Sequence, residues 1–252
     1  MRHHLIDVVE VNELFDAAQF ARLARAAVAD IQQHGRVPIL CGGTGLYFKA
    51  FLEGLGEATP ANSELRAVLE ATAPGDLLRE LEERDPVTFD KIDRGNPRRV
   101  IRALEVIRLT GKPFSAQRAR WSGEGGRQKA EGFFCLSRAG EDLRARIEAR
   151  VDGMFARGLV KEVEKLLRRG LAENRTAMQA IGYRQVVEHL RGEQRSLTET
   201  IDLVKQRTRQ FAKRQMTWFR GQFSLEWLHL EPNANAEEMA AELVGRFKKQ
   251  RL

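Results

Sequence analysis

A short apolar run that opens directly into a glycine-rich turn constrains the fold of this chain more than any other feature. Residues 37–41 read Val-Pro-Ile-Leu-Cys, are followed by Gly-Gly-Thr-Gly, and lead into a helical pattern over residues 46–52. A continuous apolar run of this length is typical of a parallel strand covered on both faces. The segment therefore predicts a strand, a tight turn and a helix, the repeating unit of an α/β sheet.

Similar signals along the rest of the chain predict more strands and helices. Strands are expected at residues 4–9, 133–137 and 226–230. Asp16 and Ser196 each precede an amphipathic pattern and are followed three residues later by Gln or Glu, the spacing of a helix-capping box. Further helices are expected over residues 141–169 and from about residue 236. This alternation predicts an α/β fold with a parallel sheet core flanked by helices.

Residues 57–130 depart from this alternation. Prolines divide the segment into several short predicted helices, and a Gly-rich loop closes it. We interpret it as a helical insertion domain within an α/β core formed by residues 1–56 and 131–252. A chain of 252 residues is long enough for one large domain or two smaller ones with a hydrophobic core.

The chain carries a surplus of positive charge, with 42 Lys and Arg against 35 Asp and Glu and a net charge of +7. This surplus predicts attraction to polyanions, among them RNA, DNA and diphosphates. A membrane is not an expected partner, because no apolar run approaches the roughly 20 residues that span a bilayer and the start has no signal-peptide pattern. A cytoplasmic protein is therefore expected. Cys41 and Cys135 lie in apolar runs and are predicted to be small buried side chains.

The basic stretch 205–220 mixes cations with aromatic rings on one predicted helix. Its cations include Arg207, Arg209, Lys213, Arg214 and Arg220. Lys and Arg attract phosphates, and an aromatic ring or guanidinium plane stacks on an unpaired base, so this mixture favours structured RNA. The alternative is an ordinary amphipathic helix, in which Phe211, Gln215 and Trp218 pack inward and the cations are only solvated.

Two further segments carry candidate residues, each with a structural alternative. Thr44 in the glycine turn is placed to donate a hydrogen bond to a base or a phosphate, although a tight turn alone would have the same sequence. Arg98, Arg99 and Arg102 crowd a capped helix start, where the helix dipole favours anions, which indicates a phosphate or carboxylate partner. The alternative there is a surface salt-bridge network with Glu105.

Two other groups of polar residues are less specific. A polar-aromatic turn that precedes a predicted helix contains Gln179, Gly182, Tyr183 and Arg184. Its composition alone favours a plain helix entry. The helix expected after residues 133–137 carries Arg144, Arg146 and Arg150, which either grip a diphosphate or pair with Glu148 and Asp152.

Five segments occur in a distinctive order along the chain. They are Arg2-His-His-Leu-Ile-Asp7, Pro38-Ile-Leu-Cys-Gly-Gly-Thr-Gly-Leu-Tyr-Phe-Lys49, Arg98-Arg-Val-Ile-Arg-Ala-Leu-Glu-Val106, Ala180-Ile-Gly-Tyr-Arg184 and Thr208-Arg-Gln-Phe-Ala-Lys-Arg-Gln-Met-Thr-Trp-Phe-Arg220. In this order they resemble the tRNA dimethylallyltransferases, also called isopentenyl-diphosphate tRNA transferases. The resemblance covers essentially the whole chain, and the last segment is too specific for chance to explain it.

The resemblance implies a P-loop-NTPase-like parallel sheet and a helical insertion that closes on the anticodon loop of tRNA. Members of the family transfer a dimethylallyl group from its diphosphate to the exocyclic amine of the adenine next to the anticodon, using Mg²⁺. They hold the diphosphate with a P-loop and use an Asp in a following Asp-Ser-x-Gln segment as general base. This chain begins after both, so the first strand, the P-loop, the catalytic Asp and the metal ligand are expected to be absent from it.

The tRNA-binding half of the family's site is largely present by the same resemblance. The residues implied to contact tRNA are Thr44, Arg66, Arg98, Arg99, Arg102, Gln179, Gly182, Tyr183, Arg184, Lys213, Arg214, Gln215, Thr217, Trp218 and Arg220. Arg150 matches a family arginine that faces the diphosphate. Arg98 departs from the family, which usually has Gln there; a cation still suits a phosphate but changes a base-edge contact.

Two functions are consistent with these observations. The chain is either a tRNA dimethylallyltransferase or an N-terminally truncated, catalytically silent tRNA-binding relative. The lack of a Walker A lysine argues against a third class, a small-molecule kinase of the P-loop type. The expected partners are a tRNA anticodon stem-loop and dimethylallyl diphosphate, and the chain is expected to act as a monomer.

Overall fold

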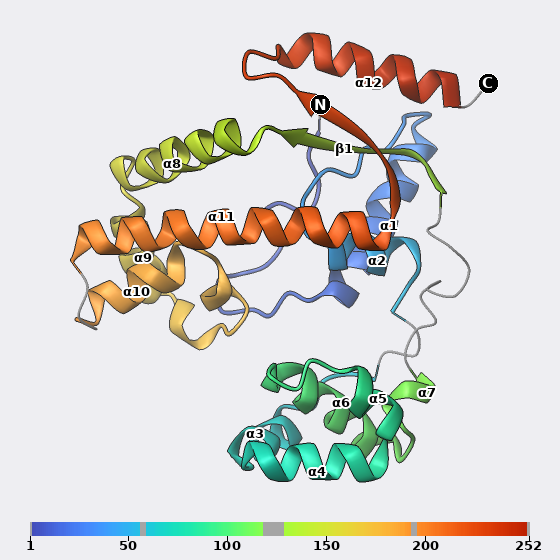
Figure 1. Cartoon of the computed structure of the whole chain (residues 1–252), viewed down its shortest axis with the longest axis vertical. Coiled ribbons are helices and arrows are strands. Elements are labelled where there is room, and N and C mark those ends of the chain that lie inside the picture. Colours follow the sequence, from blue (N-terminus) through green and yellow to red (C-terminus); the bar gives the residue numbers. More distant parts are fainter. Residues whose placement is uncertain (1, 56–58, 118–128, 193–195, 251–252) are drawn as a thin grey trace. The chain divides into compact units, whose positions relative to one another are not determined.

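The computed structural model describes residues 2–55, 59–117, 129–192 and 196–250. Contacts within the chain divide it into two compact units, each considered by itself below. We call Met1–Phe48 together with Ser122–Leu252 the core unit, and Lys49–Trp121 the helical unit. Figure 1 labels most of their elements. The helical unit begins and ends before the limits of the insertion expected at residues 57–130.

Two parallel strands, β1 (Lys129–Arg138) and β2 (Ser224–Leu230), form the sheet in the described part of the core unit. Cys135 of β1 lies opposite Trp227 of β2. Both strands include the residues expected to form them. Because parallel strands need a long connection, the helices that lie between β1 and β2 in sequence are the crossover. The α/β class with a parallel sheet is confirmed.

Several helices make up the rest of the described core unit. They are α1 (Ala17–Gln33), α8 (Gly140–Ala156), α9 (Leu159–Leu167), α10 (Tyr183–Leu190), α11 (Leu197–Gln222) and α12 (Ala236–Gln250), with short 3-10 turns η1 (Leu171–Glu173) and η2 (Ala177–Gln179). Helix α2 (Gly45–Leu52) begins in this unit. The Asp16 carboxylate accepts a hydrogen bond from the Gln19 N–H at 2.8 Å. Ser196 and Glu199 exchange the two bonds of a capping box, which confirms both predicted helix starts.

Two expected strands do not form. Residues 4–9 contain Leu5 and Asp7 with φ of 61° and 52°, and this left-handed backbone is incompatible with an extended strand. Residues 37–41 have no ladder partner among the described residues, and Pro38 removes one of the donors that a ladder needs. The side chain of Ile39 is consequently 71% exposed, and Cys41 is exposed instead of buried.

The single helix expected over residues 141–169 is two helices. Gly158 has a φ of 96°, a left-handed conformation that glycine adopts without a steric penalty. The chain therefore turns between α8 and α9. Helix α8 packs along α11, and α9 packs on α10. Figure 1 shows α11 as the long helix to which these shorter helices attach.

Two apolar clusters hold the helices of the core unit together. Ile147 and Val151 of α8 pack against Val204 of α11. The second cluster joins α9, η1 and α10 through Leu159, Val163, Leu171, Val186 and Val187, all of which are buried. Helix α11 is thus fixed by packing over its N-terminal half, where it meets α8 and α10.

The helical unit has a core of its own. Its helices are α3 (Ser63–Ala71), α4 (Pro74–Arg84), α5 (Pro86–Lys91), α6 (Pro97–Thr110) and α7 (Phe114–Gln117). Seven residues of α6 are buried, and Leu104 and Ile107 pack against Leu69 and Leu81 from α3 and α4. Asp85 joins α5 to α7, because its buried carboxylate accepts hydrogen bonds from the backbone and hydroxyl groups of Thr88 and Ser115. In the described parts of the chain, no helix has the length and apolarity that crossing a membrane requires.

Candidate nucleic-acid interface

The glycine turn before α2 packs directly against the C-terminal half of α11. A Cβ atom added at Gly45 would overlap the ring of Trp218, and one added at Gly43 would overlap the side-chain amide of Gln215. The Gln215 amide donates a hydrogen bond to the Gly43 carbonyl at 2.9 Å. Two glycines are therefore needed here because the backbone of the turn approaches the helix closely.

Aromatic rings hold this end of α11 in place. Phe219 makes edge contacts with Phe48 of α2 and with Trp218, at ring-centroid distances of 5.9 and 5.1 Å. Trp218 in turn contacts Phe223 at 5.8 Å, close to the start of β2. Such pairs stabilise a helix beyond the apolar area they bury. Trp218 and Gln215, both expected to bind tRNA, thus have a packing role in this structure.

Thr44 lies between the two glycines and is exposed. Its carbonyl accepts hydrogen bonds from the N–H groups of Tyr47 and Phe48, at 2.9 and 3.3 Å, which starts α2. The Thr44 hydroxyl has no hydrogen-bond partner within the described residues. The backbone of this residue therefore serves the turn, whereas its hydroxyl is accessible to a ligand.

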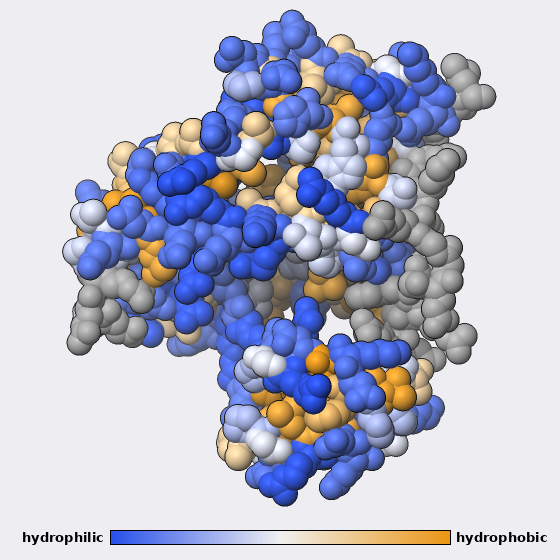
Figure 2. Space-filling model, viewed as in Figure 1, coloured by the Kyte–Doolittle hydropathy of each residue, from blue (hydrophilic) through white to orange (hydrophobic). Residues whose placement is uncertain are grey.

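The opposite face of α11 is cationic. Lys213, Thr217 and Arg220 are exposed and spaced by four and three residues, so they share one face of the helix. Arg214 is also exposed and lies over the ring of Phe211, 5.9 Å from its centroid. Figure 2 shows that hydrophilic side chains cover much of the visible side of α11.

The cations of α11 differ along its length. In the N-terminal half, Lys205 pairs with Asp152 at 2.6 Å and Arg209 pairs with Glu148 at 2.9 Å, both carboxylates of α8. In the C-terminal half, the described residues provide no carboxylate partner for the cations at 213, 214 and 220. An exposed cation without a carboxylate is available to a phosphate, so this half is the better candidate interface.

In the helical unit, two expected tRNA contacts share one buried carboxylate. Arg66 and Arg102 donate to Glu105 at 2.7 and 2.8 Å, and the backbone N–H of Asn62 donates to it at 2.9 Å. Burial raises the pKa of the carboxyl, but these three hydrogen bonds outweigh burial, so the pKa of Glu105 lies below its usual value. The side chain of Glu105 is fully buried, whereas those of the two arginines are 35% and 34% exposed.

The start of α6 bears the other arginines of this group. Arg98 and Arg99 lie in its first turn and are exposed. Pro97 occupies the first helical position, and Asn96 precedes it, but the Asn96 side chain makes no capping hydrogen bond, contrary to the capped start expected from the sequence. The salt-bridge alternative is therefore present for Arg102, and Arg66 joins it. The sequence suggested a network on the surface, whereas the carboxylate of Glu105 at its centre is buried.

The turn before α10 has partners of its own. Gly182 is buried, with a φ of 104°, and its N–H donates to Gln185 at 2.8 Å. The Tyr183 hydroxyl donates to Glu162 at 2.5 Å; burial and this bond raise the pKa of Tyr183 to about 12. Arg184 pairs with Glu188 at 2.8 Å. These contacts are those of a helix entry, and Gln179 lies exposed at the end of η2.

The pairing alternative for the arginines of α8 is confirmed for Glu148 but not for Asp152. Arg144 pairs with Glu148 and Arg146 with Asp142, each at 2.9 Å. Asp152 is taken by α11, as described above. Arg150 is exposed, and no carboxylate of the described residues pairs with it. It is therefore the α8 arginine that remains available for an anionic ligand.

Sequence reasoning missed one structural carboxylate altogether. Asp85 is 2% exposed and its four hydrogen bonds lower its pKa by more than burial raises it. The pattern Asp-Pro-x-Thr at 85–88 is a helix-start signal that could have identified it. The distant partner Ser115 has no such local signal.

Comparisons with known proteins identify relatives that match this chain over most of its length. The model of the family described as IPP transferase matches residues 1–222. A tRNA dimethylallyltransferase of Trichlorobacter lovleyi is 43% identical over 95% of this chain and 79% of its own, and one of Solibacter usitatus is 42% identical over 97% and 80%. The crystal structure of a full-length tRNA isopentenylpyrophosphate transferase from Bacillus halodurans is 33% identical, with a TM-score of 0.64, over 99% of this chain and 79% of that one.

Proposed function

We propose that this chain, which belongs to the IPP transferase family, acts in tRNA modification by transfer of a dimethylallyl group to an adenine of tRNA. The observation that carries the proposal is the C-terminal half of α11. It combines cations that lack carboxylate partners with close packing on a turn that exposes the Thr44 hydroxyl. The helix thus offers cations to a phosphate backbone on one face, and the turn packed on its other face offers a hydroxyl that can bond to a base.

The tRNA-binding role extends to the residues of the other groups described above. Arg66 and Arg102 each retain an exposed edge while bound to Glu105, and Arg98 and Arg99 are exposed at a helix start. Gln179 and the turn over Gly182, Tyr183 and Arg184 are part of the same proposal. We assign the helical unit to the anticodon loop, which agrees with its surplus of exposed arginines on α6.

The donor is dimethylallyl diphosphate, and Arg150 is the residue proposed to face it. In the reaction, the adenine amine forms a bond to the carbon of the dimethylallyl group that carries the diphosphate. The carbon–oxygen bond breaks, its electron pair leaves with the diphosphate, and the amine loses a proton. Catalysis of this kind depends on positioning and on neutralising the departing diphosphate. The 252 residues contain no Walker A sequence and no Asp-Ser-x-Gln segment to supply a diphosphate cradle and a proton acceptor.

Mg²⁺ is the metal proposed from the family, and it would neutralise charge on the diphosphate. In the stretches that the structure describes, no group of three His, Cys, Asp or Glu side chains is arranged to hold a metal ion. We further propose a cytoplasmic monomer as the working form.

Binding and turnover, measured separately, test this function. The 252-residue polypeptide is mixed with unmodified tRNA, and binding is followed by fluorescence anisotropy; dimethylallyl diphosphate and Mg²⁺ are then added and prenylated adenosine is measured by mass spectrometry. We expect binding, with turnover at least about 10⁴-fold below that of the Trichlorobacter lovleyi relative, because several electrostatic groups are missing together.

The outcomes separate the two functions considered. Failure to bind tRNA would contradict the proposed substrate. Turnover close to that of the relative would contradict the division into donor and acceptor halves. Turnover restored by a polypeptide carrying a Walker A segment would favour the enzyme over the silent tRNA-binding alternative.

A further inference from the structure

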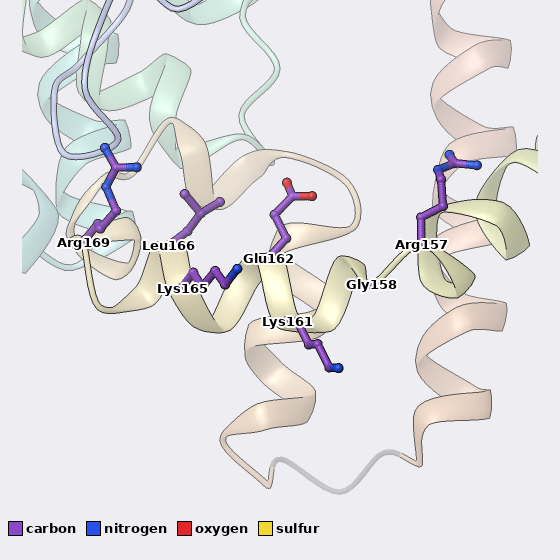
Figure 3. A pocket seen from close by; sticks show the side chains of 7 residues that line it. All are labelled: Arg157, Gly158, Lys161, Glu162, Lys165, Leu166 and Arg169. Atoms are coloured by element: carbon purple, nitrogen blue, oxygen red, sulfur yellow. The ribbon is translucent and has the colours of Figure 1, made fainter.

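Helix α9 carries a second cationic surface, separate from the one on α11. Five cations occur between residues 157 and 169, against two carboxylates. We call Arg157, Lys161, Lys165, Arg168 and Arg169 the α9 basic face; all five are exposed. Four of them line an open hollow of about 420 Å³ together with Gly158, Glu162 and Leu166. Figure 3 shows Arg169 at one end of this hollow and Arg157 at the other.

Most cations of this face lack a carboxylate partner. Arg169 pairs with Glu10 at 2.6 Å. The remaining members, at positions 157, 161, 165 and 168, have no ion-pair partner within the described ranges. The neighbouring carboxylate of Glu162 is engaged by the Tyr183 hydroxyl and points to the other side of α9 from Lys161 (Figure 3). Helix α8, by contrast, pairs two of its arginines internally.

This arrangement is unfavourable for the free protein. Lys161 and Lys165 are four residues apart in α9, and like charges at this spacing destabilise a helix by about 0.2 to 0.5 kcal/mol. The helix dipole favours cations at the C-terminal end of α9 but opposes Lys161, which lies in the first turn. Dipole stabilisation therefore accounts for only part of the face, and an external anion would remove the remaining repulsion.

The scaffold beneath the face is rigid. Leu159 and Val163 are 4% and 0% exposed and fix α9 on the buried cluster with α10. The Asn174 amide donates to the carbonyls of Val11 and Glu13, both at 2.8 Å, which ties the N-terminal segment beside η1. The cations are thus presented from a fixed backbone, so only side-chain freedom is lost when an anion binds.

We infer that the α9 basic face contacts the phosphate backbone of the bound tRNA, away from the adenine that is modified. The inference rests on the proposed function. The hollow has only Lys, Arg and Glu groups with one leucine and no aromatic ring, so it offers charge without base stacking. Phe155 packs against both the cluster below α9 and the separate cluster that contains Val204 of α11, and Val204 lies about 16 Å along that helix from Gln215. This separation suits a phosphate several nucleotides from the Thr44 turn.

Two matched double variants test the inference. Lys161→Gln with Lys165→Gln removes two charges from the face; Lys248→Gln with Lys249→Gln removes two from α12 in the same unit. Gln has nearly the helix propensity of Lys, so both should fold. The affinity of each full chain for tRNA is measured from about 50 to 200 mM salt. We expect the first variant to bind about tenfold more weakly at low salt, with a log–log slope reduced by about 1.4 to 1.8, and the second to match the wild type.

Thermal melting supplies a second readout, in which the variant that binds tRNA more weakly is expected to be no less stable than the wild type. Without tRNA, the Lys161/Lys165 variant should melt at the same temperature as the wild type or higher, because repulsion on α9 is relieved. If that double variant fails to fold, Lys165→Gln alone is measured against Lys248→Gln, with half the change in slope expected. Equal slopes for the α9 and α12 variants would overturn the inference while leaving tRNA binding intact. Absence of binding by the wild type would overturn the proposed function and the inference together.

Discussion

The helical unit and the core unit use arginines of similar appearance in different ways. In the helical unit, Arg66 and Arg102 converge on the buried carboxylate of Glu105 and close the packing of α3 on α6. In the core unit, the C-terminal half of α11 is held by aromatic contacts. Its cations at 213, 214 and 220 have no carboxylate partner among the described residues. The first arrangement stabilises the unit; the second is available to a ligand.

This difference teaches that a basic residue in a matching segment can have two roles at once. A guanidinium that is 35% exposed while bound to a buried carboxylate retains donors that point to solvent. Glu105 fixes its orientation before any RNA arrives. The lysine and arginine at 213 and 220 have no buried carboxylate beneath them, although the Arg220 guanidinium lies 5.2 Å from the centroid of the Trp227 ring, so they contribute mainly charge.

Removing the buried charge should have the largest effect on stability. Glu105→Gln keeps the side-chain volume but leaves two arginines facing a neutral amide. Breaking a fully buried pair costs about 3 to 5 kcal/mol; because the arginines are one-third exposed, we expect about 2 to 3 kcal/mol. Hydrogen exchange of the α3 and α6 amides measures this loss within the helical unit. Glu80→Gln, which removes a more exposed carboxylate from its pairs with Arg84 and Arg108, should cost less than about 1 kcal/mol.

The same comparison predicts an acid limit. The pKa of Glu105 lies below its usual value, as does that of Asp85. Their stabilisation is therefore fully present above the unfolded-state pKa, about 4.3 for Glu, and is lost as the pH falls through the lower folded-state pKa. Exchange protection in the helical unit should hold at pH 5 and decline below about pH 4.

For the two variants described before, equal losses of stability from Glu105→Gln and Glu80→Gln would contradict the role given to the buried carboxylate.

The glycine turn of the core unit should be the next most sensitive feature. Gly45→Ala forces the Trp218 ring out of its aromatic contacts and should cost about 2 kcal/mol or more. Gly43→Ala meets the flexible end of Gln215, which can turn aside with the loss of one hydrogen bond, about 1 kcal/mol. Denaturant unfolding of both variants checks the order. If Gly43→Ala were the more damaging, the ring contact would not be what fixes α11.

The smallest expected effect concerns a single hydroxyl. Thr44→Val keeps the shape of the exposed side chain and the backbone bonds that start α2, so stability should be unchanged. Loss of one hydrogen bond of about 1 kcal/mol should weaken binding of an anticodon stem-loop about fivefold. Anisotropy titration measures it, and unaltered affinity would leave Thr44 with a role in the turn alone.

Local signals in the sequence account for the parts of the fold that depend on local physics. Capping boxes marked the starts of α1 and α11, and apolar runs marked β1 and β2. Residues 37–41 have an equally good strand pattern, but a strand also requires a neighbour with which to exchange hydrogen bonds, and no such neighbour lies in the described residues. The break at Gly158 depends on a left-handed φ that the amphipathic pattern around it conceals.

The candidate site shows the same limit. Resemblance selected Gln215 and Trp218 as tRNA contacts, whereas their packing on Gly43 and Gly45 depends on residues about 170 positions apart meeting in space. The pairing of Arg66 with Glu105 is likewise a tertiary contact. The face shared by Lys213, Thr217 and Arg220, by contrast, follows from their spacing along one helix and is a local property.

The salt dependence of tRNA binding tests the central claim, that availability of a cation decides its role, most directly. Lys213→Gln with Arg220→Gln removes two cations that lack carboxylate partners; Lys205→Gln with Arg209→Gln removes a matched Lys and Arg from the same helix that pair with Asp152 and Glu148. Dissociation constants for an anticodon stem-loop are measured over a series of salt concentrations. We expect the first variant to reduce the log–log slope by about 1.4 to 1.8 and the second to leave it near the wild-type value. Equal slopes for the two variants, or a larger loss from the paired cations, would contradict the account.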